Sequence, residues 1–156
     1  MTDTIEQPNI NRANDLRYVI NTSNRAMYQG ITPPDHFKDP YLSFDDIVQD
    51  FHEMNFYVYK SQDDIVGVTA LEIETTEVGK IQRCYVLPSY QRKGIGTALM
   101  THLQKTAEGM GLRQLKLHVG EAAYWAINFY RKLGYETIER QEQVWGVTLV
   151  MAKQLL

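Results

Sequence analysis

The sequence is poor in cysteine and has no long apolar run. Cys84 is the only cysteine in 156 residues, so an internal disulfide is excluded. Cysteine and histidine do not cluster with the spacing of zinc ligands, and we expect no metal site. No apolar stretch approaches the length that spans a membrane, and residues 1–7 contain acids where a signal peptide needs bases. We therefore expect a cytoplasmic protein with no membrane partner.

The sequence also lacks an excess of basic residues. It has 16 Lys and Arg against 19 Asp and Glu, which gives a formal net charge of −3. This balance offers no basic surface to a nucleic acid or to an anionic membrane, and we expect neither as a partner. Repeats, low-complexity runs and linkers are absent as well. At 156 residues and 44% hydrophobic, the chain 1–156 is predicted to form a single domain.

Changes in hydrophobic period predict the order of helices and strands. Prolines 33, 34 and 40 make residues 31–40 a loop. Ser43 and Asp46 form a capping-box pair that starts the second helix. Helices are expected over 15–28, from 43 past 51, over 95–110 and over 121–133. Strands are expected over 4–10, 56–60, 65–74, 78–86, 112–119, 136–141 and 144–153.

The segment 86–97 joins a predicted strand to a predicted helix through a tight loop. Gly94 and Gly96 have no Cβ, so the backbone there can approach a ligand closely. The first amides of the helix have no partners within the helix and attract anions. Gln91, Arg92 and Lys93 add further donors. The pattern favours a phosphate site, although an ordinary strand-to-helix turn would have the same composition.

Two common phosphate loops do not fit this segment. A P-loop needs Gly-x-x-x-x-Gly-Lys followed by Ser or Thr, and that string does not occur. The dinucleotide pattern needs a third glycine or alanine where Leu99 stands. What does occur is Gln-x-x-Gly-x-Gly, directly after the Val-x-Pro end of a strand.

That loop resembles the acyl-CoA pyrophosphate loop of the GCN5-related N-acetyltransferase (GNAT) superfamily. A second segment, Ala-Ile-Asn-Phe-Tyr-Arg-Lys-Leu-Gly-Tyr-Glu at 126–136, is similar to the superfamily's Ala-x-x-Phe-Tyr-x-Lys-x-Gly-Phe. The predicted element order β-α-α-β-β-β-α-β-α-β-β also resembles that of the superfamily. The resemblance implies an α/β (α+β) fold, with a mixed, mostly antiparallel sheet of about seven strands, four flanking helices and a splay between strands 4 and 5.

The resemblance also implies an activity. The expected reaction is transfer of an acetyl group from acetyl-CoA to a primary amine of a small molecule or peptide. The alternative is a non-catalytic acyl-CoA-binding regulatory module. A phosphate- or nucleic-acid-binding domain is disfavoured, because aromatic residues do not alternate with bases.

Site residues follow from the matched motifs. Tyr130 matches the superfamily's general acid, and a phenol with a pKa near 10 holds its proton at neutral pH. Periodicity alone makes Tyr130 a core aromatic and Cys84 a small buried residue. The residues expected to contact the cosubstrate are Cys84, Tyr85, Val86, Gln91, Arg92, Lys93, Gly94, Ile95, Gly96 and Thr97.

Two positions depart from the superfamily's pattern. Ala123 stands where relatives often carry an asparagine that helps to hold the pantetheine arm, so that contact is not carried over. Lys80 stands where some relatives have a glutamate on the fourth strand, which leaves the general base open. Glu72, Glu74 or a water chain are the candidates.

The acceptor is equally open. Residues 35–53 contain six acids against the single base Lys38, which could attract a cationic amine. The acids Asp45 and Asp46 also suit a helix N-terminus for structural reasons alone. Polyamine, amino acid, peptide N-terminus, lysine side chain and aminoglycoside remain possible acceptors. Excess apolar residues in the last strands, with Trp145 next to Gly146, predict a homodimer.

Overall fold

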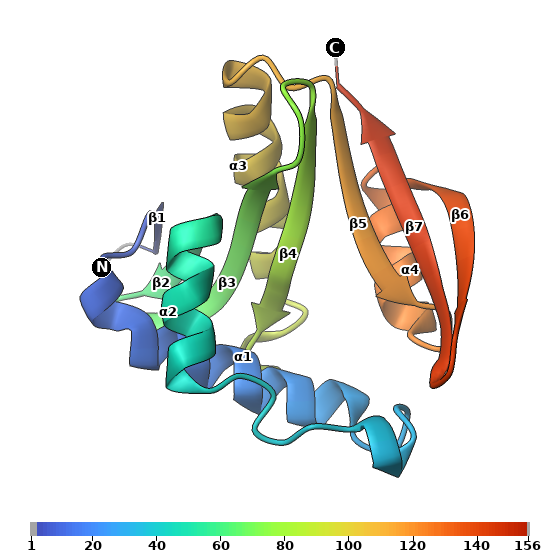
Figure 1. Cartoon of the computed structure of the whole chain (residues 1–156). Helices are drawn as coiled ribbons and strands as arrows, with labels where there is room; N and C mark the ends of the chain where they lie inside the picture. The colour runs from blue at the N-terminus through green and yellow to red at the C-terminus, as the bar shows by residue number, and fades with distance from the viewer. Residues whose placement is uncertain (1–2, 156) are drawn as a thin grey trace.

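The computed structural model describes residues 3–155, which form one mixed sheet with helices on both faces (Figure 1). Within these residues the sheet has seven strands in the order β1-β2-β3-β4-β5-β7-β6. Every neighbouring pair is antiparallel except β4 with β5. The strands are β1 (Thr4–Glu6), β2 (Asn55–Ser61), β3 (Asp64–Ile73), β4 (Val78–Val86), β5 (Gln114–Gly120), β6 (Glu136–Gln143) and β7 (Gly146–Gln154). The predicted fold class is confirmed.

The described residues also form the four expected α-helices. They are α1 (Ala13–Tyr28), α2 (Phe44–Glu53), α3 (Ile95–Gly109) and α4 (Tyr124–Lys132). The capping box that starts α2 is present, since the Asp46 amide donates to Ser43 Oγ (3.1 Å) and the Ser43 amide donates to Asp46 Oδ2 (2.9 Å). No helix in residues 3–155 is both long and apolar enough to cross a membrane.

Two predicted boundaries differ from the structure by three or four residues, and a hydrogen bond accounts for each difference. The first strand ends at Glu6 rather than at residue 10, because Asn9 caps a short 3-10 turn by accepting from the Asn11 amide (2.9 Å). The fourth helix begins at Tyr124 rather than at Glu121. The Glu121 amide instead donates to the Val147 carbonyl (2.8 Å), which keeps that residue attached to β7.

Two main apolar clusters lie on opposite faces of the sheet. Leu16, Ile20 and Ile47 of α1 and α2 pack against Val58 and Val68 on one face. On the other face, α3 and α4 pack against the inward side chains of β3, β4, β5 and β7. β3 therefore lies between helices on both faces, and its residues Ile65 to Leu71 are buried without alternation.

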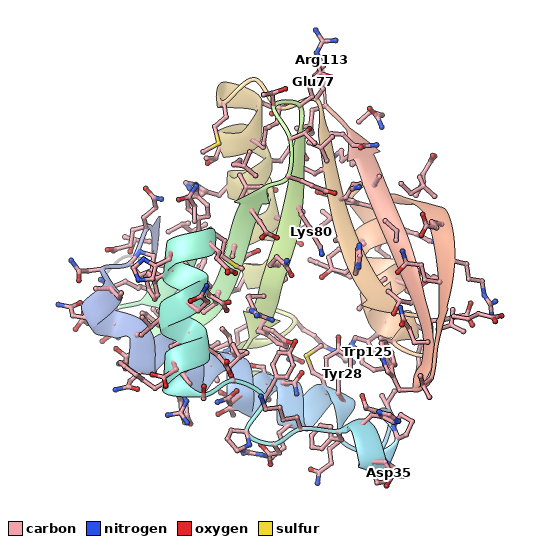
Figure 2. All side chains as sticks on the ribbon, in the orientation of Figure 1. Tyr28, Asp35, Glu77, Lys80, Arg113 and Trp125 are labelled. Atoms are coloured by element: carbon pink, nitrogen blue, oxygen red, sulfur yellow. The ribbon has the colours of Figure 1, made fainter. Side chains whose placement is uncertain are left out.

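The splay predicted between strands 4 and 5 is present (Figure 1). β4 and β5 form register pairs only at their beginnings, at Val78 with Gln114, Gly79 with Leu115 and Lys80 with Lys116. The closed end is sealed where the Arg113 and Gln114 amides donate to the Glu77 carbonyl, at 2.7 and 3.1 Å (Figure 2). From Lys80 onward the two strands separate. Their open ends face the end of α1 and the start of α4.

Gly79 is expected to be essential to the closed end. A Cβ at this position would lie 2.8 Å from Leu71 Cδ1 and 2.9 Å from Leu112 Cδ1, in a fully packed core. We expect Gly79→Ala to lower the free energy of unfolding by about 1 to 3 kcal/mol, the usual cost of overpacking. Urea denaturation measures this change. Gly120→Ala is the matched strand control, because its Cβ would meet no described atom within 4 Å. Equal effects of the two variants would contradict the steric argument.

Candidate active site

A cavity of about 610 Å³ lies at the open end of the splay. Its walls come from the end of α1, the end of β4, the loop that follows, the first turn of α3, and α4. Eight of the ten residues predicted to contact the cosubstrate line it, together with Tyr130. The eight are Cys84, Val86, Gln91, Arg92, Gly94, Ile95, Gly96 and Thr97.

The other two predicted residues lie elsewhere. Tyr85 lines a second cavity on the opposite side of β4. Lys93 projects from the loop with its Nζ 5.3 Å from the centre of the Tyr90 ring. Tyr90 itself lines the first cavity, so Lys93 borders the cavity through this ring.

The two glycines of the loop have different structural roles. Gly94 is the N-cap of α3 with φ +82°, a left-handed conformation that glycine adopts without strain. The first turn of α3 has no side-chain cap, so its leading amides are available to a ligand. At Gly96 a Cβ would lie 3.2 Å from Phe129 Cζ. Gly96 therefore also permits the close contact between α3 and α4, a role that the sequence did not indicate.

A β-bulge in β4 sets the directions of the side chains around the site. Val68 pairs with Tyr85 and Ala70 with Gln82, so both Arg83 and Cys84 lie opposite Thr69. Arg83 has φ +54°, which is unusual for a residue with a side chain. The extra residue puts Arg83 on the face of α2 and turns Cys84 toward α4.

An ion pair to α2 holds the bulge. Arg83 Nε and Nη2 donate to the two carboxylate oxygens of Asp50, at 2.8 and 3.3 Å, and Arg83 Nη1 donates to Tyr41 Oη at 3.2 Å. The side chains are 19% and 7% exposed for Arg83 and Asp50 respectively. Such a bidentate, largely desolvated pair fixes orientation as well as charge. The sequence carried no local signal for this bulge.

Tyr130 and Cys84 meet on one wall of the first cavity. Burial raises the pKa of the Tyr130 hydroxyl well above 10, and the nearby Cys84 thiol raises it further. Burial likewise raises the pKa of Cys84 to about 11, which the neighbouring side chains of Tyr130 and Thr69 only partly offset. Both groups are therefore protonated at neutral pH. Tyr130 can act as a proton donor, whereas Cys84 is not an activated nucleophile.

Two aromatic residues that the sequence did not single out complete this cavity together with Phe129 of the second motif. Tyr28 from α1 and Trp125 from α4 lie across the open end from each other, with ring centres 6.1 Å apart (Figure 2). Phe129 lies between Gly96 and Tyr130, with its ring centre 5.3 Å from that of Tyr130. Aromatics at helical spacing are typical of a core, so periodicity could not distinguish them from core residues.

A second cavity of about 410 Å³ shares Tyr28 and Ile31 with the first. It lies between the end of α1, the loop before α2, the exposed end of β5 and the β6–β7 turn. Tyr85 and Asn24 line it, and the Tyr85 hydroxyl donates to Asn24 Oδ1 at 3.2 Å. Two adjoining cavities on the two sides of the splay can hold two reactants.

The predicted base candidates lie away from both cavities. Glu72 accepts a hydrogen bond from Gln82 Nε2 (2.9 Å), and Glu74 pairs with Lys116 (3.3 Å). Neither glutamate is among the residues that line the cavities. His118 does line the second cavity. Its pKa is lowered by burial and by Lys80 and Lys116, so the ring is neutral at pH 7.

Ala123 is the N-cap of α4 and is almost completely buried. Asn128 is exposed on the outer side of the same helix and does not replace the missing asparagine. Across residues 3–155, no three His, Cys, Asp or Glu side chains gather closely enough to hold a metal ion.

The splayed mixed sheet, together with the glycine loop that starts α3 at its open end, defines an acetyltransferase-type fold. The model of the Acetyltransferase (GNAT) family matches residues 19–135, and the chain belongs to this family. It is 36% identical over 93 residues to an uncharacterized N-acetyltransferase of Methanocaldococcus jannaschii, an alignment that covers 56% of this chain and 41% of the relative. The chain spans about half the length of the curated relatives it matches.

Two solved structures illustrate the likeness of fold. The PaiA N-acetyltransferase of Thermoplasma acidophilum, in complex with coenzyme A, has a TM-score of 0.83 at 20% identity and covers 99% of this chain and 100% of its own. A GNAT family acetyltransferase of Elizabethkingia anophelis with acetyl-CoA bound has a TM-score of 0.72 at 17% identity and covers 98% of each chain. At these identities the likeness shows the fold alone.

The Arg83–Asp50 pair gives a test of the bulge. Asp50→Ala leaves a largely buried guanidinium without its carboxylate, and we expect the free energy of unfolding to fall by about 3 kcal/mol. Urea denaturation measures the loss. Glu121→Ala is the control, since it removes the exposed pair with Arg140 and should change stability much less. A small effect of Asp50→Ala would mean that the backbone of β4 holds the bulge without this ion pair.

Proposed function

We propose that the protein transfers an acetyl group from acetyl-CoA to a primary amine. The observation that carries the proposal is the convergence of eight residues of the loop and strand motif with Tyr130 in one cavity. These residues come from two motifs about 30 positions apart in the sequence. A structural role alone would not require both motifs to border the same empty space.

The residues present fit the cosubstrate. The amides from Arg92 to Thr97 would hold the pyrophosphate at the N-terminus of α3. The backbone of Cys84 to Val86, at the open end of β4, would hold the pantetheine and thioester groups. Two side chains already fix this strand end, because Ser23 Oγ and Gln91 Nε2 both donate to the Val86 carbonyl, at 3.1 and 3.0 Å. We therefore propose that Gln91 supports the loop through this hydrogen bond and also lines the cosubstrate site.

The chemistry divides between the two cavities. Acetyl-CoA would supply an activated acetyl thioester in the first cavity, and the amine would approach from the second. Tyr130 would hold its proton until the thiolate leaves and would then donate it to the sulfur. Glu72 and Glu74 do not line either cavity, so we propose that water removes the proton from the amine.

A non-catalytic acyl-CoA-binding module is the second candidate. The buried Ala123 favours it, since this residue offers no side-chain hydrogen bond to a pantetheine arm. The presence of Tyr130 in the cavity argues for catalysis instead. We also retain two predictions about assembly, namely that residues 1–156 form a single domain and that the chain forms a homodimer through the apolar residues of its last strands, with Trp145 next to Gly146.

Binding of acetyl-CoA is the first test. We expect millimolar acetyl-CoA to raise the melting temperature by several degrees, as ligand binding to the folded state requires. In Gly96→Val the new side chain collides with Phe129 and obstructs the amides, so the ligand-induced shift should largely disappear. Gly109→Val, at the far end of α3, should keep the full shift. Absence of any shift in the unaltered protein would overturn the proposal.

Tyr130→Phe tests the proton donor. This change removes only the hydroxyl and keeps the ring that contacts Phe129 and Tyr135. We expect kcat to fall by about 10²-fold or more, with little change in acetyl-CoA affinity. Tyr124→Phe is the control on the same helix, because Tyr124 is 70% exposed and should leave kcat unchanged. Release of coenzyme A with the best acceptor measures the rate. Full activity of Tyr130→Phe would assign proton delivery to water.

A further inference from the structure

The second cavity carries information about the acceptor, on the assumption that the proposed acetyl transfer is correct. Its walls are rich in aromatic rings that come from four separate segments. Tyr28 ends α1, Phe37 and Tyr41 lie in the loop before α2, Tyr85 lies on β4, and Trp145 lies in the β6–β7 turn. A cavity of about 410 Å³ is large enough for a small molecule or for the first residue of a peptide.

The acids that suggested a cationic acceptor do not line this cavity. No Asp or Glu of the described residues is among its lining residues. Asp39 pairs with Arg25 (2.8 Å), and Asp50 pairs with Arg83 (2.8 Å). Asp46 caps α2 and also pairs with Lys38 (3.7 Å). The structure thus assigns these three acids to structural roles.

The remaining acids of the segment are exposed, namely Asp35, Asp45 and Glu53. Figure 2 shows Asp35 pointing outward, away from the gap between β4 and β5. The interpretation of the acidic segment as an attractor for a cation is therefore not supported by the positions of its side chains.

Among the described residues that line the second cavity, the one with a formal charge is the base Lys38. Two histidines, His36 and His118, also lie in its lining. Figure 2 shows Lys80 in the gap between β4 and β5. The groups that act on His118 are Lys80 and Lys116, opposed by Glu74 and Glu139, and with burial the result is a lowered pKa. The described residues that line this cavity offer no carboxylate to the further positive charges of a polyamine or an aminoglycoside.

One polar pair offers the amine a position. The Tyr85 hydroxyl and Asn24 Oδ1 are hydrogen-bonded at 3.2 Å, and Asn24 is only 8% exposed. Tyr85 directly follows Cys84, which borders the first cavity beside Tyr130. The remaining lone pairs of these two oxygens can accept a hydrogen bond from one amino group. The rings around them provide apolar surface for the rest of the molecule.

From this combination we propose that the acceptor is a primary amine carried on an aromatic or apolar group, with no second positive charge. A small arylalkylamine has this chemistry, and so does the α-amino group of a peptide that begins with an aromatic residue. Polyamines and aminoglycosides do not.

The test is release of coenzyme A with a panel of acceptors. The panel contains 2-phenylethylamine, a tetrapeptide amide beginning with Phe, the same peptide beginning with Lys, spermidine and kanamycin. We expect kcat/KM to be at least tenfold higher for 2-phenylethylamine, for the Phe peptide or for both than for the polycations, because burial of one ring is worth at least this factor. A preference for 2-phenylethylamine would identify the acceptor as a small arylalkylamine, and a preference for the Phe peptide would identify it as a peptide N-terminus.

Variants connect the preference to the cavity. Trp145→Ala should lower kcat/KM for the aromatic acceptor by about tenfold while leaving the KM for acetyl-CoA unchanged. Val144→Ala is the matched control, since the neighbouring Val144 is 96% exposed and does not line the cavity. Lys38→Glu should raise kcat/KM for spermidine by weakening the positive field.

The two proposals fail in different ways. A higher kcat/KM for spermidine or kanamycin would overturn the acceptor inference and leave the acetyltransferase function standing. Equal losses in Trp145→Ala and Val144→Ala would also overturn it. Stabilisation by acetyl-CoA with no release of coenzyme A from any acceptor would overturn the proposed function, and the acceptor inference with it.

Discussion

The bulge at Arg83 is the constraint on which the rest of the site depends. It directs Arg83 toward Asp50 on α2 and Cys84 toward α4, which reverses the faces that a regular strand would give these two side chains. A regular strand would have left Cys84 on the α2 face. The left-handed backbone at Arg83 is itself unfavourable for a residue with a Cβ. The ion pair with Asp50 and the contact with Tyr41 help to offset that cost.

Because β4 and β5 splay apart next to this bulge, two cavities that share lining residues lie at the open end of β4. β4 and β5 remain paired only as far as Lys80 and Lys116, so the backbone of β4 beyond that point has no strand neighbour on that side. The unpaired N–H and C=O groups of such a strand edge can bind a ligand or pair with another strand. The end of α1 closes the opening from outside, and its Tyr28 borders both cavities. The end of α1 therefore lies between the first cavity and the second.

Much of the fold could be predicted from local patterns, because each has a local physical cause. The bounds of β4, the capping box at Ser43 and the glycine loop all follow from a few adjacent residues. The bulge could not be predicted, since Arg83 is held by a residue 33 positions away. The same limit applies to the acids of 35–53. Their partners, such as Arg25 and Arg83, lie on other elements, so composition alone overstated the charge available to a ligand.

Burial in the first cavity bears on the energetics of proton transfer. Burial raises the pKa of Tyr130, which on its own would make the phenol a poorer acid toward an ordinary thiolate. Cys84, a thiol in the same place, shows the compensating effect, because its pKa rises to about 11 for the same reason. A thiolate that forms beside Tyr130 would be desolvated in the same way and become a stronger base. In the proposed reaction the two pKa values would rise together, and the desolvation that makes Tyr130 hold its proton would also make a leaving sulfur better able to accept it.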